Sequence, residues 1–190
     1  MSTPAKPRFP RDAALVVAGE LVHLLGPVCE RIAIAGSLRR GKADVGDVEI
    51  LFIPRIEERP VDMFAMQPFS LAEEAIQRLL DAGTLTKRPN ITGGTTWGDK
   101  NKLALHTASG IPVDLFAATE DNWFNYLVCR TGPAESNQRI ATAAHNLGWK
   151  WNPYGPGFTH TATNEQRACH SEEAVFAFVG LPFHLPENRR

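Results

Sequence analysis

Apolar positions recur along the chain with two spacings, one typical of helices and the other of strands. Apolar residues that recur every three or four positions predict amphipathic helices. Apolar residues that alternate with polar ones, or that form short runs bounded by turn residues, predict strands. The first part of the chain then gives, in order, a helix at Ala13 to about Leu25 capped by Asp12, a strand at Cys29 to Ala35, a short helical segment after Gly36-Ser37, and a strand at Asp47 to Ile53. The segment from Arg55 to Phe69 contains Pro60 and Pro68 and is expected to be irregular.

The second part of the chain opens with the clearest helix start. Ser70 is expected to cap a helix, with Glu73 at the capping-box position and Gly83 at the end. The later elements are, in order, a short strand near Thr84 to Lys87, a hairpin of Lys102 to Thr107 and Ile111 to Ala117, a helix from Asp121, a helix from Pro133 to Leu147, a strand at Trp149 to Trp151, a helix from Ser171 to about Phe178, and an extended tail from Leu181 to Arg189.

Composition narrows the class of protein. The 190 residues, 43% hydrophobic and 22% charged, are typical of a soluble globular protein with one domain or two small subdomains. No apolar run approaches the roughly 20 residues that span a bilayer, and the amino terminus lacks the apolar core of a signal peptide, so we expect a cytoplasmic protein that does not enter membranes. Three widely spaced cysteines indicate neither a disulfide framework nor a cysteine zinc site.

The net charge of −1 is not that of a tight nucleic-acid binder, because such proteins usually carry a basic excess. Positive charge is nevertheless concentrated in two places. One group is Lys87, Arg88, Lys100 and Lys102, and the other is Arg39, Arg40 and Lys42. These groups fit either a weak grip on nucleic acid or an ordinary solvated surface.

Candidate chemistry lies in the stretch from Ile32 to Ile53. Side chains alternate faces along a strand, so Asp47 and Glu49 are expected on one side. Two carboxylates so placed suit Mg²⁺, whose shell is completed by phosphate oxygens and water. The Gly36-Ser37 turn offers backbone N–H groups and a hydroxyl to a phosphate. A third carboxylate, Asp114, stands alone in the apolar run IPVDLFA, although a solvated edge strand would also explain such carboxylates.

Four segments carry a resemblance to a known family. The stretch AGSLRRGKADVGDVEIL resembles the catalytic signature of the family X DNA polymerases, the polymerase beta-like nucleotidyltransferases, which reads G-S-x-R-R-G and then G-D-x-D or G-D-x-E. IPVDLFA looks like the strand that bears that family's third carboxylate. RTGPAESNQRIATAAHNLGWKWNPYG looks like its T-G-x-x-x-x-N segment, and SEEAVFAFVGLPFHLPENR is similar to its final helix and extended end.

The resemblance covers roughly Pro10 to the end of the chain and implies an α+β fold. Residues 1–118 would form a nucleotidyltransferase palm with a mixed β-sheet and flanking helices. Residues 119–190 would form a small α+β carboxyl-terminal subdomain that contacts the nascent base pair and DNA. The chain has no room before residue 30 for the lyase domain or the DNA clamps of larger members, so we expect a minimal form without them.

The resemblance also implies roles for particular residues. Asp47, Glu49 and Asp114 would hold two Mg²⁺ or Mn²⁺ ions, and a nucleoside triphosphate would be bound through its phosphates by Gly36, Ser37, Arg40 and Gly46. Asn137 would contact the incoming base or sugar. Local positive charge, and not the resemblance, makes Lys87, Arg88, Lys100, Lys102 and Arg130 candidates for contacting DNA. Some positions depart from the better-known members of the family. Glu49 replaces an aspartate, Cys129-Arg130 replaces an aromatic pair that helps to exclude ribonucleotides, and Ala141 replaces an arginine that reads the template side.

The expected function is a small template-directed DNA polymerase that extends primer ends or fills gaps. It would act as a monomer on a DNA primer-template. An accessory protein could supply the DNA affinity that a chain with a net charge near zero does not provide. Two alternatives stay open at this point. One is a nucleotidyltransferase without a template, acting on a terminus, a protein or a small molecule, and the other is a nucleic-acid-binding accessory protein with a degenerate site.

Overall fold

The computed structural model describes residues 7–63 and 65–189, which divide into two compact units. The first unit consists of the chain up to Ile34 together with Asp44–Ala117, and the second of Ala35–Ala43 together with the chain from Ala118 onward. Residues 35–43 thus group with the second unit, although in the sequence they lie between two segments of the first.

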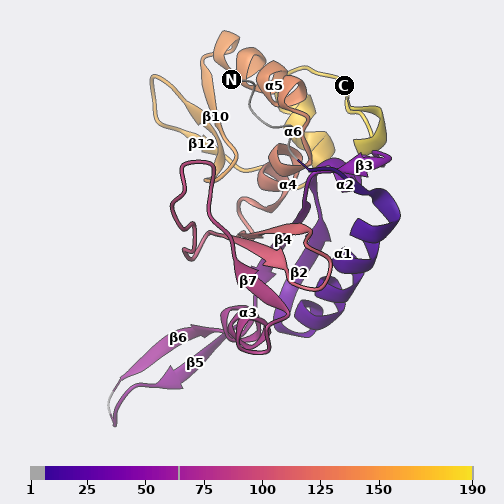
Figure 1. Cartoon of the computed structure of the whole chain (residues 1–190). Helices are drawn as coiled ribbons and strands as arrows, with labels where there is room; N and C mark the ends of the chain where they lie inside the picture. The colour runs from indigo at the N-terminus through magenta and orange to yellow at the C-terminus, as the bar shows by residue number, and fades with distance from the viewer. Residues whose placement is uncertain (1–6, 64, 190) are drawn as a thin grey trace. The chain divides into compact units, whose positions relative to one another are not determined.

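A five-stranded mixed sheet forms the centre of the first unit (Figure 1). Its strands lie in the order β2 (Cys29–Ile34), β4 (Val48–Pro54), β9 (Pro112–Ala117), β8 (Asn101–His106) and β7 (Leu85–Lys87). β4 and β9 run parallel, whereas the other neighbours are antiparallel. The predicted mixed sheet and the hairpin of β8 and β9 are thus confirmed.

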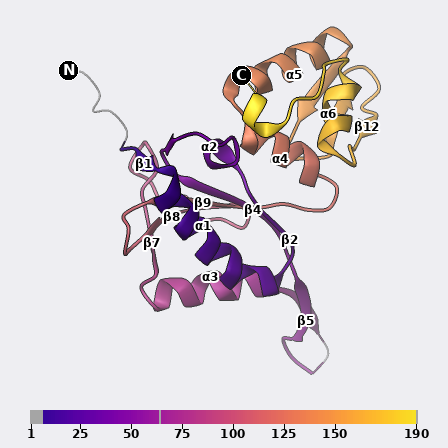
Figure 2. The same ribbon diagram turned by 90° about the vertical axis from the view of Figure 1, so that its right-hand side faces the viewer.

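Two helices, α1 (Arg11–Leu25) and α3 (Leu71–Asp81), cover one face of this sheet (Figure 2). Ser70 caps α3 as predicted, since its Oγ accepts a hydrogen bond from the Glu73 N–H at 3.2 Å. Asp12 is not the cap of α1. The helix begins earlier, with Pro10 at the N-cap. Asp12 lies in the first turn, where its negative charge interacts favourably with the positive end of the helix dipole. No helix in the described ranges is long and apolar enough to cross a membrane.

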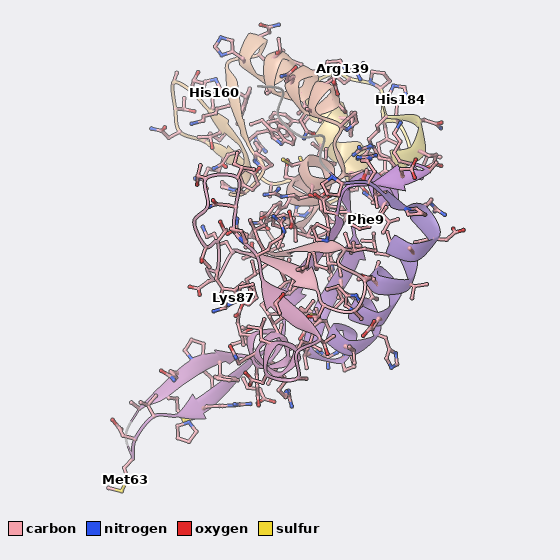
Figure 3. All side chains as sticks on the ribbon, in the orientation of Figure 1. Phe9, Met63, Lys87, Arg139, His160 and His184 are labelled. Carbon is pink, nitrogen blue, oxygen red and sulfur yellow. The ribbon has the colours of Figure 1, made fainter. Side chains whose placement is uncertain are left out.

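The segment predicted to be irregular is instead a β-hairpin, made of β5 (Ile56–Pro60) and β6 (Met66–Ser70). Each strand of a two-stranded sheet has one outward edge, so the missing N–H groups of Pro60 and Pro68 are tolerated there. Met63, near the tip, is 88% exposed (Figure 3). A second short pair, β1 (Phe9–Pro10) with β3 (Asp44–Val45), was also not predicted.

The second unit combines helices with a small sheet. Its elements are α2 (Gly36–Arg39), α4 (Trp123–Thr131), α5 (Ala134–Asn146), the antiparallel strands β10 (Trp149–Asn152), β11 (Gly157–His160) and β12 (Gln166–Arg167), and α6 (Glu172–Phe178). Its core is made of Val128, Ile140, Ala144, Phe158, Cys169, Val175, Phe176 and Val179. Ser171 caps α6 as predicted, with its Oγ 3.0 Å from the Ala174 nitrogen. The tail is not extended throughout, because Pro186–Asn188 forms a 3₁₀ turn.

Gly157 begins β11 with a φ of +97°, where a side chain has no room. A Cβ added there would lie 2.6 Å from Asn125 Nδ2 and 2.8 Å from the Arg167 carbonyl oxygen. We expect Gly157→Ala to lower the free energy of unfolding by about 3 kcal/mol, from overpacking together with backbone strain. Gly180→Ala, with φ +71° and open space, is the control for backbone strain alone, at about 1 kcal/mol. Urea unfolding of both variants measures this difference, and equal losses would contradict the steric argument.

Candidate active site

The three predicted carboxylates belong to two neighbouring strands of the first unit. Asp47 directly precedes β4, Glu49 lies in β4, and Glu49 is the register partner of Asp114 in the parallel strand β9. Register partners in a sheet point to the same face, and residues two apart do so as well. Val48 and Ile50, the two neighbours of Glu49 in β4, are fully buried. The alternation that the sequence indicated therefore places the carboxylates together on one face.

That face is opposite to the one covered by helices. On β8, the Lys102 Nζ donates to Glu73 Oε1 of α3 at 2.5 Å, and His106 Nε2 lies 3.4 Å from Glu20 Oε2 of α1. Leu103, between these two, is the register partner of Asp114. The helix side of the sheet is thus taken by Lys102 and His106, and the carboxylates project to the other side.

Asp114 already has a positive partner, because Arg88 Nη2 donates a hydrogen bond to Asp114 Oδ1. The two side chains are 22% and 15% exposed. Three carboxylates supply the hard oxygen donors that suit Mg²⁺, yet among residues 7–63 and 65–189 no group of three or more acidic, His or Cys side chains is arranged to hold a metal ion. The guanidinium takes the position of a cation on Asp114, so metal binding would require Arg88 to release this carboxylate.

The predicted nucleic-acid contacts of the first unit differ in their surroundings. Lys87 (Figure 3) and Lys100 are exposed. The Lys87 Nζ lies 4.9 Å from the centre of the Trp97 ring. Lys102 is only 3% exposed and is held by Glu73 and the Gly98 carbonyl oxygen. A phosphate contact by Lys102 does not fit these surroundings, whereas Lys87 and Lys100 can meet a ligand in solvent.

The predicted phosphate turn lies at the start of α2 in the second unit. Gly36 adopts φ +67°, a conformation that favours glycine, and Ser37 follows half-buried. Arg40 donates a hydrogen bond to the Thr131 carbonyl oxygen at the end of α4. Gly46, by contrast, is buried in the first unit, one residue before Asp47. The sequence motif is therefore shared between the two units.

An ion network that the sequence did not reveal fixes α2 within the second unit. The Arg39 guanidinium donates to both carboxylate oxygens of Glu172, at 3.0 and 2.5 Å, and to Thr131 Oγ1 at 2.7 Å. Arg189 Nη2 donates to Glu172 Oε2 at 2.6 Å. Burial alone would raise the pKa of Glu172, but hydrogen bonds from the two guanidiniums outweigh it and hold the pKa below its usual value.

Asn137 and Arg130 lie at the junction of α4 and α5. The Asn137 Nδ2 donates to the Cys129 carbonyl oxygen at 2.8 Å, while its Oδ1 is buried with no hydrogen-bond partner in the described part of the chain. Arg130 lies 5.4 Å from the ring centres of both Tyr126 and Tyr154. Burial, with a hydrogen bond to Cys129, raises the pKa of Tyr154 to about 12, so this hydroxyl stays protonated. Arg130 at the end of α4 therefore lies against two tyrosine rings.

Comparison with known proteins adds two findings. Residues 126–190 match the family described as DNA polymerase beta thumb. The chain is similar in fold to the crystal structure of Leishmania infantum polymerase beta in a ternary P/T complex, with a TM-score of 0.73, 18% sequence identity, and coverage of 97% of this chain and 77% of that chain. No curated protein matches the sequence. The chain therefore has a polymerase beta-like α+β fold, and its residues 126–190 match the polymerase beta thumb.

Proposed function

We propose that the protein is a metal-dependent nucleotidyltransferase that adds nucleotides to a primer 3′-hydroxyl and releases pyrophosphate, as a template-directed DNA polymerase acting at gaps or primer ends. The observation that carries this proposal is the pairing of Glu49 with Asp114 across two parallel strands, on the sheet face opposite to α1 and α3, in a polymerase beta-like fold. A catalytic face of this kind needs several carboxylates with fixed spacing, and the sheet register supplies it.

The carboxylates would hold two divalent ions. Asp47, Glu49 and Asp114 provide oxygen donors that suit Mg²⁺ or Mn²⁺. When bound, such a pair of ions activates the attacking hydroxyl and offsets the charge of the leaving pyrophosphate. Arg88 holds the Asp114 carboxylate in place until it is needed, and β4 and β9 keep Glu49 and Asp114 at a fixed separation during the reaction. The extra methylene of Glu49 lengthens the reach of one donor relative to an aspartate.

The phosphates and the base would be bound by the remaining motif residues. The backbone at Gly36 and Gly46, the Ser37 hydroxyl and the Arg40 guanidinium provide hydrogen-bond donors for the triphosphate. Positive charge from Arg40 would stabilise the leaving group as its charge grows. Asn137, whose Nδ2 donates a hydrogen bond to the Cys129 carbonyl oxygen, would contact the incoming base or sugar.

DNA binding by the isolated protein is expected to be weak. Lys87 and Lys100 are the exposed candidates of the first unit, Arg130 packs on tyrosines, and the net charge is −1. Because few side chains would contact DNA phosphates, we expect distributive synthesis whose rate falls steeply as the salt concentration rises. An accessory protein would increase the affinity for DNA. The active unit would be a monomer on a primer-template.

The test is extension of a labelled primer on gapped, recessed and single-stranded DNA, with each dNTP or rNTP singly and with Mg²⁺ or Mn²⁺. We expect one templated nucleotide per binding event, and less discrimination against rNTPs than an aromatic pair at Cys129-Arg130 would give. Addition that ignores the template would instead assign a terminal transferase. If no nucleotide is incorporated into any DNA substrate, the assignment as a polymerase is wrong. The remaining functions would then be nucleotide transfer to another acceptor or nucleic-acid binding without catalysis.

A further inference from the structure

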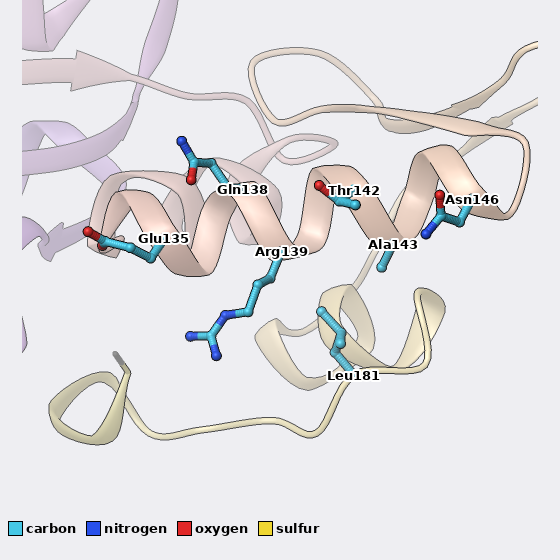
Figure 4. Close-up of a pocket in the computed structure, with 7 residues that line it drawn as sticks. All are labelled: Glu135, Gln138, Arg139, Thr142, Ala143, Asn146 and Leu181. Atoms are coloured by element: carbon cyan, nitrogen blue, oxygen red, sulfur yellow. The ribbon is translucent and has the colours of Figure 1, made fainter.

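A small cavity lies between α5 and the tail that follows α6, within the second unit. Its volume is about 50 Å³, and its walls are formed by Ser136, Arg139, Phe176, Leu181, Pro182, His184 and Arg189. It adjoins a wider groove of about 720 Å³ along α5, with which it shares Arg139 and Leu181. Figure 4 shows the Arg139 side chain extending from α5 toward the tail, beside Leu181. The cavity is several times larger than the roughly 10–15 Å³ that one water molecule requires.

Arg189 is the unusual residue of this wall, because it is only 3% exposed. Its Nε donates to the His184 carbonyl oxygen at 2.9 Å, and its Nη2 donates to Glu172 Oε2 at 2.6 Å. Its Nη1 is also buried, yet it has no hydrogen-bond partner within residues 7–63 and 65–189. A buried guanidinium donor without an acceptor is costly and calls for a ligand that accepts hydrogen bonds.

The charges around Arg189 point to an anion. Among the described residues, the single carboxylate of Glu172 accepts hydrogen bonds from the guanidiniums of both Arg39 and Arg189, so one negative charge is set against two positive charges. The rings of Phe176 and Phe183 lie 5.1 and 5.5 Å from the Arg189 guanidinium and offset part of that charge. The rings provide no hydrogen-bond acceptor for Arg189 Nη1. An anion in the cavity would neutralise the positive charge and accept a hydrogen bond from Nη1.

We propose that this cavity binds a phosphate group. Arg189 Nη1 donates to it from the buried end and the Arg139 guanidinium from the mouth, with the Ser136 hydroxyl and the His184 ring on the walls. Tetrahedral phosphate suits this set, because it accepts hydrogen bonds on several sides and two arginines recognise it well. The group is either free inorganic phosphate or the terminal phosphate of a nucleic-acid strand. None of these residues belongs to the proposed nucleotide site.

The experiment is a titration of the full chain with inorganic phosphate, followed by ³¹P line width and by the thermal midpoint, at constant ionic strength with chloride. At ten times the dissociation constant we expect the midpoint to rise by about 3 °C. Arg139→Gln, an exposed position, should weaken binding about tenfold, whereas Arg167→Gln, a 61% exposed arginine on β12, should leave it unchanged. Arg189→Lys, which keeps the charge but loses the Nη1 donor, should also weaken it.

A second arm compares a 5′-phosphorylated oligonucleotide with its 5′-hydroxyl form. If the protein binds the 5′-phosphorylated oligonucleotide more tightly and this preference disappears in Arg139→Gln, the bound phosphate is the terminus of a strand. If both oligonucleotides bind equally, the ligand is free inorganic phosphate. Added nucleoside triphosphate with Mg²⁺ should not displace the phosphate, since it would bind elsewhere. Equal phosphate affinity in Arg139→Gln, Arg189→Lys and the unmodified chain would overturn the proposal, as would no binding at millimolar phosphate.

Discussion

Replacement of Asp114 by Asn is expected to reduce the rate of nucleotide incorporation at least about a thousandfold, which corresponds to ~4 kcal/mol of transition-state stabilisation. The substitution keeps the shape of the side chain but removes the charge that would hold a divalent ion beside Glu49. A neutral amide binds Mg²⁺ weakly, so the metal pair would not assemble in its reactive arrangement. Single-turnover extension of a gapped primer with saturating nucleotide measures this rate directly.

The control for Asp114→Asn is Asp99→Asn, which changes the same charge at an exposed position before β8. We expect Asp99→Asn to extend the primer at the unmodified rate. In the Asp114→Asn variant the new amide oxygen can still accept a hydrogen bond from Arg88, so its thermal midpoint should stay within a few degrees of that of the unmodified protein. A folded Asp114→Asn variant with full incorporation would remove this carboxylate from the reaction.

The sheet and its carboxylates could be predicted because their signals are local. Strand alternation places Asp47 and Glu49 on one face, and the isolated charge in IPVDLFA marks Asp114. Ser70 identifies the start of α3 through its cap. Each of these inferences needs only neighbouring residues, and the periodicity of a strand or helix supplies the geometry.

Lys102 shows where local signals mislead. Its charge suggests a solvated or DNA-facing side chain, yet the alternation of β8 turns it toward the helices, where Glu73 and the Gly98 carbonyl receive its ammonium. Burial of a lysine is tolerated only because these partners are present, and both come from other elements. The ion pair between Lys102 and Glu73 therefore cannot be predicted from composition alone.

The network of Arg39, Glu172 and Arg189 could not be predicted for a related reason. Its members are separated by 133 and 17 positions in the chain, so no spacing rule connects them. The doubled arginine suggests phosphate chemistry through Arg40, while Arg39 in fact ties α2 to α6. The same contacts explain why Ala35–Ala43 packs with the second unit although its neighbours in sequence belong to the first.

Glu172→Gln should therefore destabilise the second unit strongly, by about 3 kcal/mol of unfolding free energy. The Glu172 side chain is 12% exposed and the Arg189 side chain is fully buried, so loss of the carboxylate leaves two guanidiniums without a counter-charge. Tryptophan fluorescence during urea unfolding suits the measurement, because Trp123, Trp149 and Trp151 all lie in this unit. Glu173→Gln, an exposed neighbour on α6, should change the midpoint little.

The pH dependence of this stability separates the ion network from simple packing. The pKa of Glu172 is lowered in the folded protein relative to its ordinary value of 4.5, so the unfolded chain binds its proton more readily. The stabilisation is then fully present above pH 4.5 and is lost as the pH falls through the lowered folded value. The difference between the unmodified protein and Glu172→Gln should be largest at pH 7 and should shrink below pH 4.5. A difference that stays constant with pH would show that Glu172 acts through its shape and not its charge.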